Sequence, residues 1–363
     1  MNVKSLYIEI TNQCNLNCTT CYNRSGLNKE RTELSAAQLE QIIQNFLPYG
    51  LERILLSGGE PTLHTELEQI LDLIDRYPKL SFGISTNGTI HHRKLMEYLR
   101  SRDNFTLQLS LDGSCEETNA STRGCGHFKK ALTFAGNMHT EHLHSGHVHT
   151  LSAKEPSVST KHTTAPRHTL KMVISQQNLS DVEAFCQLAF SLGFLPELAF
   201  LLKAGNGSED WDNRQLTPQQ KLQILKLADS IATKQHAQVI LPLCTTGCPY
   251  AKNLQDLSLC IQTDGAIFPC QLMRDARYVL GNALYFDHEH FLERLHHIAA
   301  LARQRLHQDY GCEKCLLHSH CGKGCMAEAW NQHQDPLACD ENCAYRKLQF
   351  LYHQMPQCHL ADQ

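Results

Sequence analysis

The feature that most constrains the fold is a strand-then-helix unit that occurs six times between residues 6 and 235. Each unit begins with a short stretch of strand character and continues with a segment whose apolar residues recur at helical spacing. The first helix opens with a capping box at Ser35, and the last opens with Thr217 as its cap and Pro218 in its first position. This alternation predicts an α/β fold, with a parallel sheet and helices on its outer face, in an open sheet or a barrel. The strands are expected at 6–11, 53–57, 80–85, 105–111, 169–175 and 195–202, and helices near 35–47, 66–77, 93–100, 126–136, 179–192 and 218–235.

Composition changes twice along the 363 residues. Residues 137–168 are rich in Ser, Thr and His without an apolar period, which predicts a long loop inserted before the fifth strand. A metal-binding role for its histidines is the alternative to a plain solvated insertion. Beyond about residue 240 the alternation stops and cysteines become dense. The sequence therefore predicts a core domain over 1–238, a cysteine-rich domain over 239–350 and a tail over 351–363.

Charge and composition exclude several classes of function. The formal net charge of −4 provides no basic field for nucleic acid, and no apolar run reaches the ~20 residues of a membrane span. The N-terminal residues do not resemble an export signal, so we expect a cytoplasmic protein. A reducing cytoplasm disfavours disulfides, and the close spacing of many of the 17 cysteines favours metal or iron–sulfur ligation.

Unusual residues follow the first four predicted strands, whose carboxyl ends share one edge of a parallel sheet. The first strand leads to Cys14, Cys18 and Cys21, three thiols that leave one coordination position open. A zinc site with a distant fourth ligand is the alternative. The second strand leads to Ser57-Gly-Gly-Glu-Pro61, the third to Ser85-Thr-Asn-Gly88, and the fourth ends in Ser110-Leu-Asp-Gly113.

Cys14, Cys18 and Cys21, followed by the aromatic Tyr22, resemble the cluster loop of the radical S-adenosylmethionine (SAM) superfamily. The resemblance implies a partial (β/α)6 barrel, similar to a TIM barrel, in which these cysteines hold a 4Fe-4S cluster and SAM binds the fourth iron. Reductive cleavage of SAM would yield a 5′-deoxyadenosyl radical that abstracts hydrogen from a substrate. The positions that the resemblance assigns to cofactor binding are Tyr22, Gly58, Gly59, Glu60, Pro61, Ser85, Asn87, Ser110, Asp112 and Arg123. For the four that follow the third and fourth strands, Ser85, Asn87, Ser110 and Asp112, ordinary turn chemistry is the alternative.

The C-terminal cysteines are similar in order to the SPASM extension of that superfamily, which carries two further 4Fe-4S clusters. Zinc ribbons are the alternative. The resemblance implies Cys248, Cys270, Cys325 and Cys244 for the first auxiliary cluster, with Cys260 as a rival to Cys244. It implies Cys312, Cys315, Cys321 and Cys343 for the second, with Cys339 as a rival to Cys343.

The resemblance implies an oxidoreductase that acts on a peptide or protein, such as a ribosomal peptide maturase that forms a crosslink. A small-molecule dehydrogenase or a cofactor-maturing enzyme is the alternative, and a non-catalytic metal-binding scaffold is disfavoured by the open coordination site. Sulfatase maturation is also disfavoured, because Gln271 follows Cys270 where those maturases carry an acid. A strand beginning at residue 6 leaves no room for a leader-peptide-binding domain, so we expect a separate leader-binding partner. A reductase or flavodoxin-type electron donor is expected as well.

Overall fold

The computed structural model describes residues 1–26, 30–138, 167–241, 247–308, 312, 314–317 and 321–354. Nearly all of the His-rich segment, like Cys244 and the predicted tail beyond residue 354, lies outside the described residues. No helix in the described ranges has the length and apolar character needed to cross a membrane.

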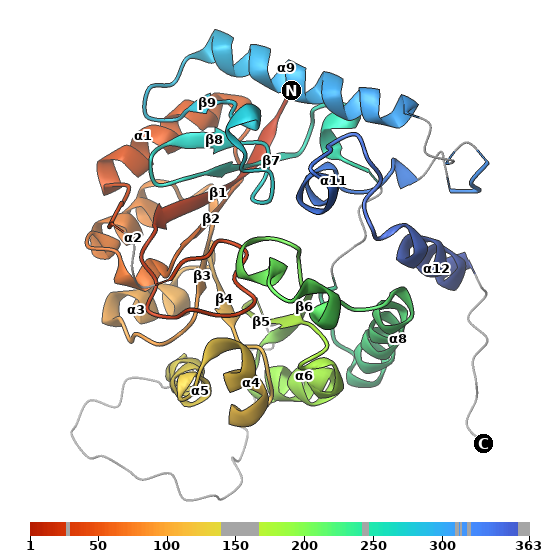
Figure 1. The fold of residues 1–363 in the computed structure, drawn as a ribbon. Helices are drawn as coiled ribbons and strands as arrows, with labels where there is room; N and C mark the ends of the chain where they lie inside the picture. The colour runs from red at the N-terminus through yellow and green to blue at the C-terminus, as the bar shows by residue number, and fades with distance from the viewer. Residues whose placement is uncertain are drawn as a thin grey trace, which may run out of the picture.

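One nine-stranded sheet organises the protein, in the order β6-β5-β4-β3-β2-β1-β7-β8-β9 (Figure 1). Strands β1 to β6 are parallel neighbours in sequence order, which confirms the predicted parallel α/β sheet. The curved sheet with helices outside it is a partial barrel, the alternative to an open sheet that the family resemblance implied. The six strands are β1 (Val3–Thr11), β2 (Arg53–Gly58), β3 (Ser81–Thr86), β4 (Phe105–Ser110), β5 (Thr169–Ile174) and β6 (Leu195–Phe200).

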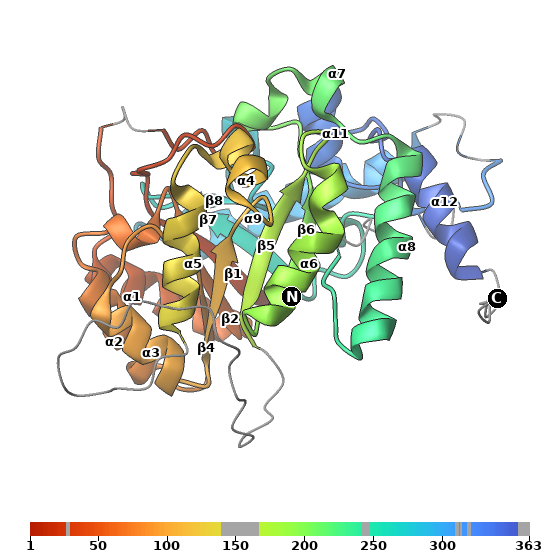
Figure 2. The same ribbon diagram turned by 90° about the horizontal axis from the view of Figure 1, so that it is seen from below.

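Helices pack on the outer face of this sheet, as Figures 1 and 2 show. The predicted caps form: Ser35 and Gln38 make a reciprocal capping box, and Thr217 and Gln220 make another. Two helices, α4 and the short α7, were not expected, and the eight residues of α4 include few apolar ones. The helices of this part are α1 (Ala36–Phe46), α2 (Leu67–Arg76), α3 (Arg93–Ser101), α4 (Glu116–Arg123), α5 (His127–Asn137), α6 (Val182–Ser191), α7 (Trp211–Arg214) and α8 (Pro218–Gln235).

The two faces of the sheet differ in chemistry. In β4 the side chains of Phe105, Leu107 and Leu109 are buried, and they alternate with the partly exposed Thr106, Gln108 and Ser110. Polar residues of neighbouring strands meet on the inner face: Gln108 donates to Glu197 at 2.8 Å, and Lys171 forms an ion pair with Glu197 at 2.9 Å. Burial opposes ionisation of Glu197, but Lys171 and the hydrogen bonds lower the pKa of this carboxyl. The apolar face thus packs against the helices, and the inner face is equipped to bind a polar ligand.

The cysteine-rich region continues the same sheet. Strand β7 (Leu257–Ile261) is parallel to β1, and β8 (Ala266–Phe268) and β9 (Gly281–Asn282) follow in antiparallel pairing. Helix α9 (His288–His307) follows β9, while α11 (Met326–His333) and α12 (Cys343–Gln354) lie toward the side of β6 and α8 in Figure 1. The boundary between residues 238 and 239 stays a prediction, and β-sheet pairing extends across it.

Candidate active site

The cysteine loop after β1 is held against the end of β2 by backbone contacts. The Gly59 N–H donates to the Thr11 carbonyl at 2.7 Å, and the Glu60 N–H donates to the Gln13 carbonyl at 2.6 Å. An added Cβ on Gly58 would lie 2.1 Å from the Thr11 oxygen, and one on Gly59 would lie 2.0 Å from the Gln13 oxygen. The two glycines therefore allow the close approach of β2 to the loop, and a direct contact with cofactor stays a prediction for them.

Glu60 is buried, and its carboxylate ties the segment after β2 to the end of β3. One oxygen accepts from the Thr62 hydroxyl at 2.6 Å and the Thr86 hydroxyl at 2.5 Å, and the other accepts from the Asn87 N–H at 2.7 Å. Burial raises the pKa of this carboxyl, while the same hydrogen bonds counteract the shift. Pro61 begins the short helical turn that follows. Glu60 therefore holds the segments after β2 and β3 in fixed relative positions.

The loop after β3 supports the cysteine loop from a second side. The Asn87 amide donates to Asn15 at 2.9 Å, and the Asn87 carbonyl is 2.8 Å from the ring Nε2 of His127. Burial, followed by the charge of Arg123, lowers the pKa of His127 to about 4, so its ring is neutral and Nε2 can donate. Ser85, two residues earlier in β3, donates to Gln108 on the inner face, and Ser110 belongs to the same polar face at the end of β4.

Asp112 and Arg123 form a buried ion pair beside Cys18. Their side chains approach to 2.9 Å, Asp112 is fully buried, and Arg123 lies 4.0 Å from the Cys18 sulfur. Asp112 also accepts from the Val173 N–H at 2.8 Å. The expected cofactor residues Asp112 and Arg123 thus come together, and the positive charge of Arg123 lies where a thiolate of Cys18 would need it.

The three cysteines lie close enough to influence one another electrostatically. Burial raises the pKa of the Cys14 thiol to about 12, with smaller contributions from Glu60, Cys18 and Cys21. Burial also raises the pKa of Cys18 to about 11, although Arg123 opposes this shift. Metal binding at such thiols releases their protons, so loading of this loop is coupled to pH.

The segment after β6 also holds the loop, a role that the sequence analysis did not assign to it. Asn206, after β6, donates from its backbone to the Cys21 carbonyl at 2.8 Å and from its amide to the Cys18 carbonyl at 2.9 Å. Arg214 is buried and donates to the Thr19 carbonyl at 3.1 Å. A buried basic residue at the end of a short helix gives no sequence signal of this role.

A second missed group surrounds Tyr22. Its hydroxyl contacts the hydroxyl of Tyr7 from β1, and Arg274 lies over its ring, 5.1 Å from the centroid. Arg274 also pairs with the buried Glu9 at 2.5 Å, and it donates to Asn23 at 2.6 Å. Because Arg274 lies four residues after Cys270, this group links the cysteine loop to the C-terminal region. The acidic Glu9 between the apolar Ile8 and Ile10 was the available signal.

Three of the cysteines expected for the first auxiliary cluster pack against the hydrophobic core. Cys270 follows β8, Cys325 precedes α11, and Cys248 precedes a short helical turn. Burial raises the pKa of the Cys248 thiol to about 11, and Cys270 adds to the shift. Cys260, the rival to Cys244, is fully buried within β7, between β1 and β8.

Five further C-terminal cysteines of the described residues line one cavity of about 260 Å³. The Arg346 guanidinium donates to the Cys321 sulfur at 3.1 Å, and the sulfurs of Cys312 and Cys339 are 3.6 Å apart. Across the described residues, no three His, Cys, Asp or Glu side chains are grouped as ligands of a single metal ion. The cysteines on the cavity wall are Cys312, Cys315, Cys321, Cys339 and Cys343, which include both candidates for the last ligand.

Comparison with known proteins finds a family match in the N-terminal part. Residues 8–152 match the family model of the radical SAM superfamily. The chain is 25% identical to "Mycofactocin maturase MftC" of Mycolicibacterium smegmatis over 88% of this chain and 77% of that protein.

Two groups of solved structures share the fold. The structure titled "Native anSMEcpe with bound AdoMet" superposes with a TM-score of 0.70 at 20% identity, covering 96% of both chains. Streptococcus suis SuiB bound to its precursor peptide SuiA superposes with a TM-score of 0.69 at 16% identity, covering 94% of this chain and 76% of that one.

Gly59→Ala tests the contact between β2 and the cysteine loop. The added methyl would overlap the Gln13 carbonyl, so we expect a loss of about 1–3 kcal/mol in unfolding free energy. We also expect faster loss of iron from the reconstituted protein, measured by absorbance during incubation with a chelator. Gly136→Ala in α5 is the control, because a Cβ there meets nothing within 4 Å. Equal iron retention in both variants would contradict the assigned role of Gly59.

Cys260→Ala and Cys244→Ala separate the rival ligands of the first auxiliary cluster. The Cys260 thiol is enclosed by strand neighbours, so its removal should leave the iron content of the reconstituted chain unchanged. Removal of Cys244 should lower it by up to about four irons per chain, the content of one cubane. Loss of iron from folded Cys260→Ala, with none from Cys244→Ala, would reverse the assignment.

Proposed function

Since residues 8–152 match the family model of the radical SAM superfamily, we propose that this enzyme removes a hydrogen atom from a peptide or protein substrate. The observation that best supports this proposal is the position of Cys14, Cys18 and Cys21. Contacts from the ends of β2, β3 and β6 hold their loop at the carboxyl edge of the sheet, above the polar inner face. That edge is where parallel sheets bind their ligands.

The donor sets fit the cofactors of this family, SAM and 4Fe-4S clusters. Cys14, Cys18 and Cys21 would hold the cluster that binds SAM, and the buried Arg123 would balance the negative charge that the thiolates bring. Reductive cleavage of bound SAM supplies a 5′-deoxyadenosyl radical that takes the hydrogen atom. Tyr22, the backbone of Gly58 and Gly59, and the hydroxyl and amide groups of Ser85, Asn87 and Ser110 would hold SAM. The two C-terminal sets, with Cys244 and Cys343 completing them, would hold the auxiliary clusters.

The proposed reaction is a net two-electron oxidation of the substrate, and the inner face of the sheet borders a proposed electron acceptor. Tyr7 of the inner face lines a cavity of about 430 Å³ together with Cys270 and Gln271, so a proposed auxiliary-cluster ligand borders the barrel interior. The substrate would lose its second electron toward that cluster. The proton would pass to a carboxylate of the interior, because Gln271 cannot accept it; Glu9, close to Tyr22, is the candidate.

A ribosomal peptide maturase that makes a crosslink or another oxidative change is the substrate class we favour. Similarity to a mycofactocin maturase along most of the chain, and to the fold of an enzyme bound to a precursor peptide, supports it. A separate leader-binding protein and a reductase or flavodoxin-type donor would be its partners. The reducing cytoplasm is the compartment that suits its many thiols.

Anaerobic reconstitution tests the chemistry. With dithionite and SAM, the native chain should yield 5′-deoxyadenosine and carry about twelve irons, four for each cubane. In Cys14→Ala/Cys18→Ala/Cys21→Ala the nucleoside should disappear and about eight irons remain, because the C-terminal cysteines are intact. Nucleoside formation that survives the triple substitution would overturn the proposed role of this loop.

A further inference from the structure

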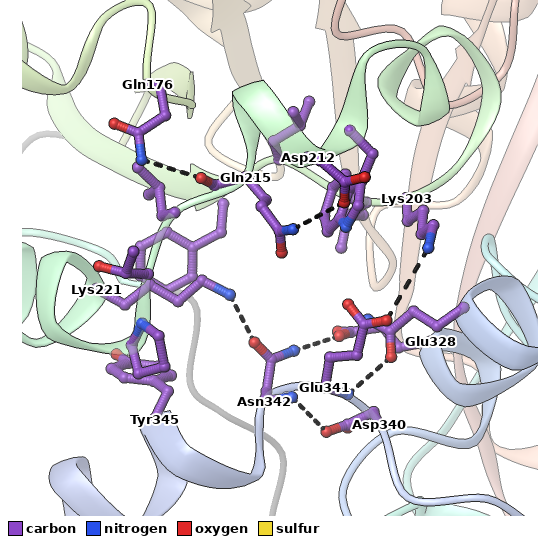
Figure 3. Close-up of a pocket in the computed structure, with 18 of the residues that line it drawn as sticks. Gln176, Lys203, Asp212, Gln215, Lys221, Glu328, Asp340, Glu341, Asn342 and Tyr345 are labelled. Atoms are coloured by element: carbon purple, nitrogen blue, oxygen red, sulfur yellow. Dashed lines mark hydrogen bonds and ion pairs between the residues drawn. The ribbon is translucent and has the colours of Figure 1, made fainter.

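A second pocket, of about 480 Å³, lies beside the edge strand β6. One wall comes from the core, from residues 199–203 and 211–221, and the other from α11, α12 and the segment between them. In Figure 3, Lys203, Asp212 and Gln215 lie on the core wall, and Glu328 and Glu341 lie on the opposite wall. This volume is in the range of sites that bind organic ligands, and residues from both parts of the chain form it.

The core wall separates this pocket from the cysteine loop. Asn206 binds the Cys18 and Cys21 carbonyls, and Arg214 binds the Thr19 carbonyl. On either side of these residues, Lys203 and Gln215 line the pocket. A molecule in the pocket is therefore separated from the cysteine loop by one segment of chain. That position suits a part of the substrate a few residues away from the reacting residue.

The lining favours long cationic side chains. Phe200 and Tyr345 pack edge to face at 5.6 Å, and Trp211 provides a third aromatic ring. Two ammonium groups of the chain itself already lie over these rings, Lys221 at 5.4 Å from the Phe200 centroid and Lys203 at 5.9 Å from that of Trp211. The methylene stem of a lysine or arginine can pack on the rings while its charge reaches a carboxylate.

The carboxylates of the pocket are incompletely matched by the cations of the chain. Asp340 has a close partner in Arg346 at 2.7 Å, whereas Glu341 is 3.9 Å from Lys203. Glu328 contacts the amide of Asn342, and no lysine or arginine of the described ranges forms an ion pair with it. Among the described residues, the pocket lining contains four carboxyl groups and three cationic groups, and Glu328 lacks an ion-pair partner there, so a further cation can pair with it.

We propose that this pocket binds a lysine or arginine of the peptide substrate. The side chain enters between the aromatic rings, and its charge pairs with Glu328 and Glu341. The inference rests on the proposed peptide substrate and adds to it a sequence requirement, a basic residue outside the reaction centre. Because two walls from different parts of the chain form the site, a substrate that fills it also joins the core to the cysteine-rich region.

An array of randomised twelve-residue peptides, probed with the reconstituted protein under anaerobic conditions, tests the proposal. Bound peptides should be enriched in lysine and arginine. Fluorescence anisotropy of the labelled best binders then gives their Kd for Glu328→Gln/Glu341→Gln, which keeps the shape of both side chains and the acceptor oxygen for Asn342. We expect binding to weaken roughly tenfold or more, the size expected when one partner of a desolvated charge pair is lost.

The control Glu183→Gln/Glu293→Gln removes the same charge from exposed positions on α6 and α9 and should leave the Kd unchanged. Glu341→Lys should shift the enrichment toward aspartate and glutamate. If peptides bind the native chain and the pocket variant equally, or without basic residues, the pocket assignment is wrong and the peptide substrate stands. If no peptide binds the native chain, while 5′-deoxyadenosine still forms, both the pocket assignment and the peptide substrate are wrong.

Discussion

The close approach of the end of β2 to the cysteine loop is the contact on which the candidate active site depends. Two backbone hydrogen bonds, from Gly59 to Thr11 and from Glu60 to Gln13, place the loop above the inner face. No side chain beyond a hydrogen atom fits between these segments. Glu60 then fixes the neighbouring strand ends through Thr86 and Asn87, so that a single carboxylate sets the relative position of the loops after β2 and β3. Backbone contacts of this kind cannot adjust by changing a rotamer, which suits a loop that must hold several ligands in one geometry.

The division of the sheet into an apolar outer face and a polar inner face separates stability from chemistry. The outer residues pack against helices, and that burial stabilises the fold independently of what the inner face binds. Inner residues such as Gln108, Lys171 and Glu197 satisfy one another by hydrogen bonds and ion pairs, so their burial costs little in the unliganded chain. The same groups can exchange partners with a ligand. Packing of the outer face against the helices therefore stabilises the fold, and the polar groups of the inner face are available to a ligand.

The sequence predicted what depends on local pattern. Periodicity and caps gave the six strands, the capped helices and the edge at which Cys14, Cys18 and Cys21 lie. It could not predict contacts between distant segments, such as Asn206 with Cys21 or Arg274 with Glu9, because these depend on how the chain closes in space. The pairing of β7 with β1, which extends the sheet, was missed for the same reason. The short helix α4 was not predicted, because its residues form no apolar stripe at helical spacing.

The core wall of the second pocket gives a physical route for coupling between substrate binding and the cysteine loop. Asn206 and Arg214 contact the loop, and Lys203 and Gln215 on the same segment line the pocket. A ligand that binds more tightly when this segment is ordered must also favour the contacts of Asn206 with Cys18 and Cys21. By linkage, an occupied cofactor site must then strengthen binding in the pocket by the same free energy. An enzyme that generates a radical benefits from this reciprocity, because cleavage of its cofactor is best delayed until a substrate is in place.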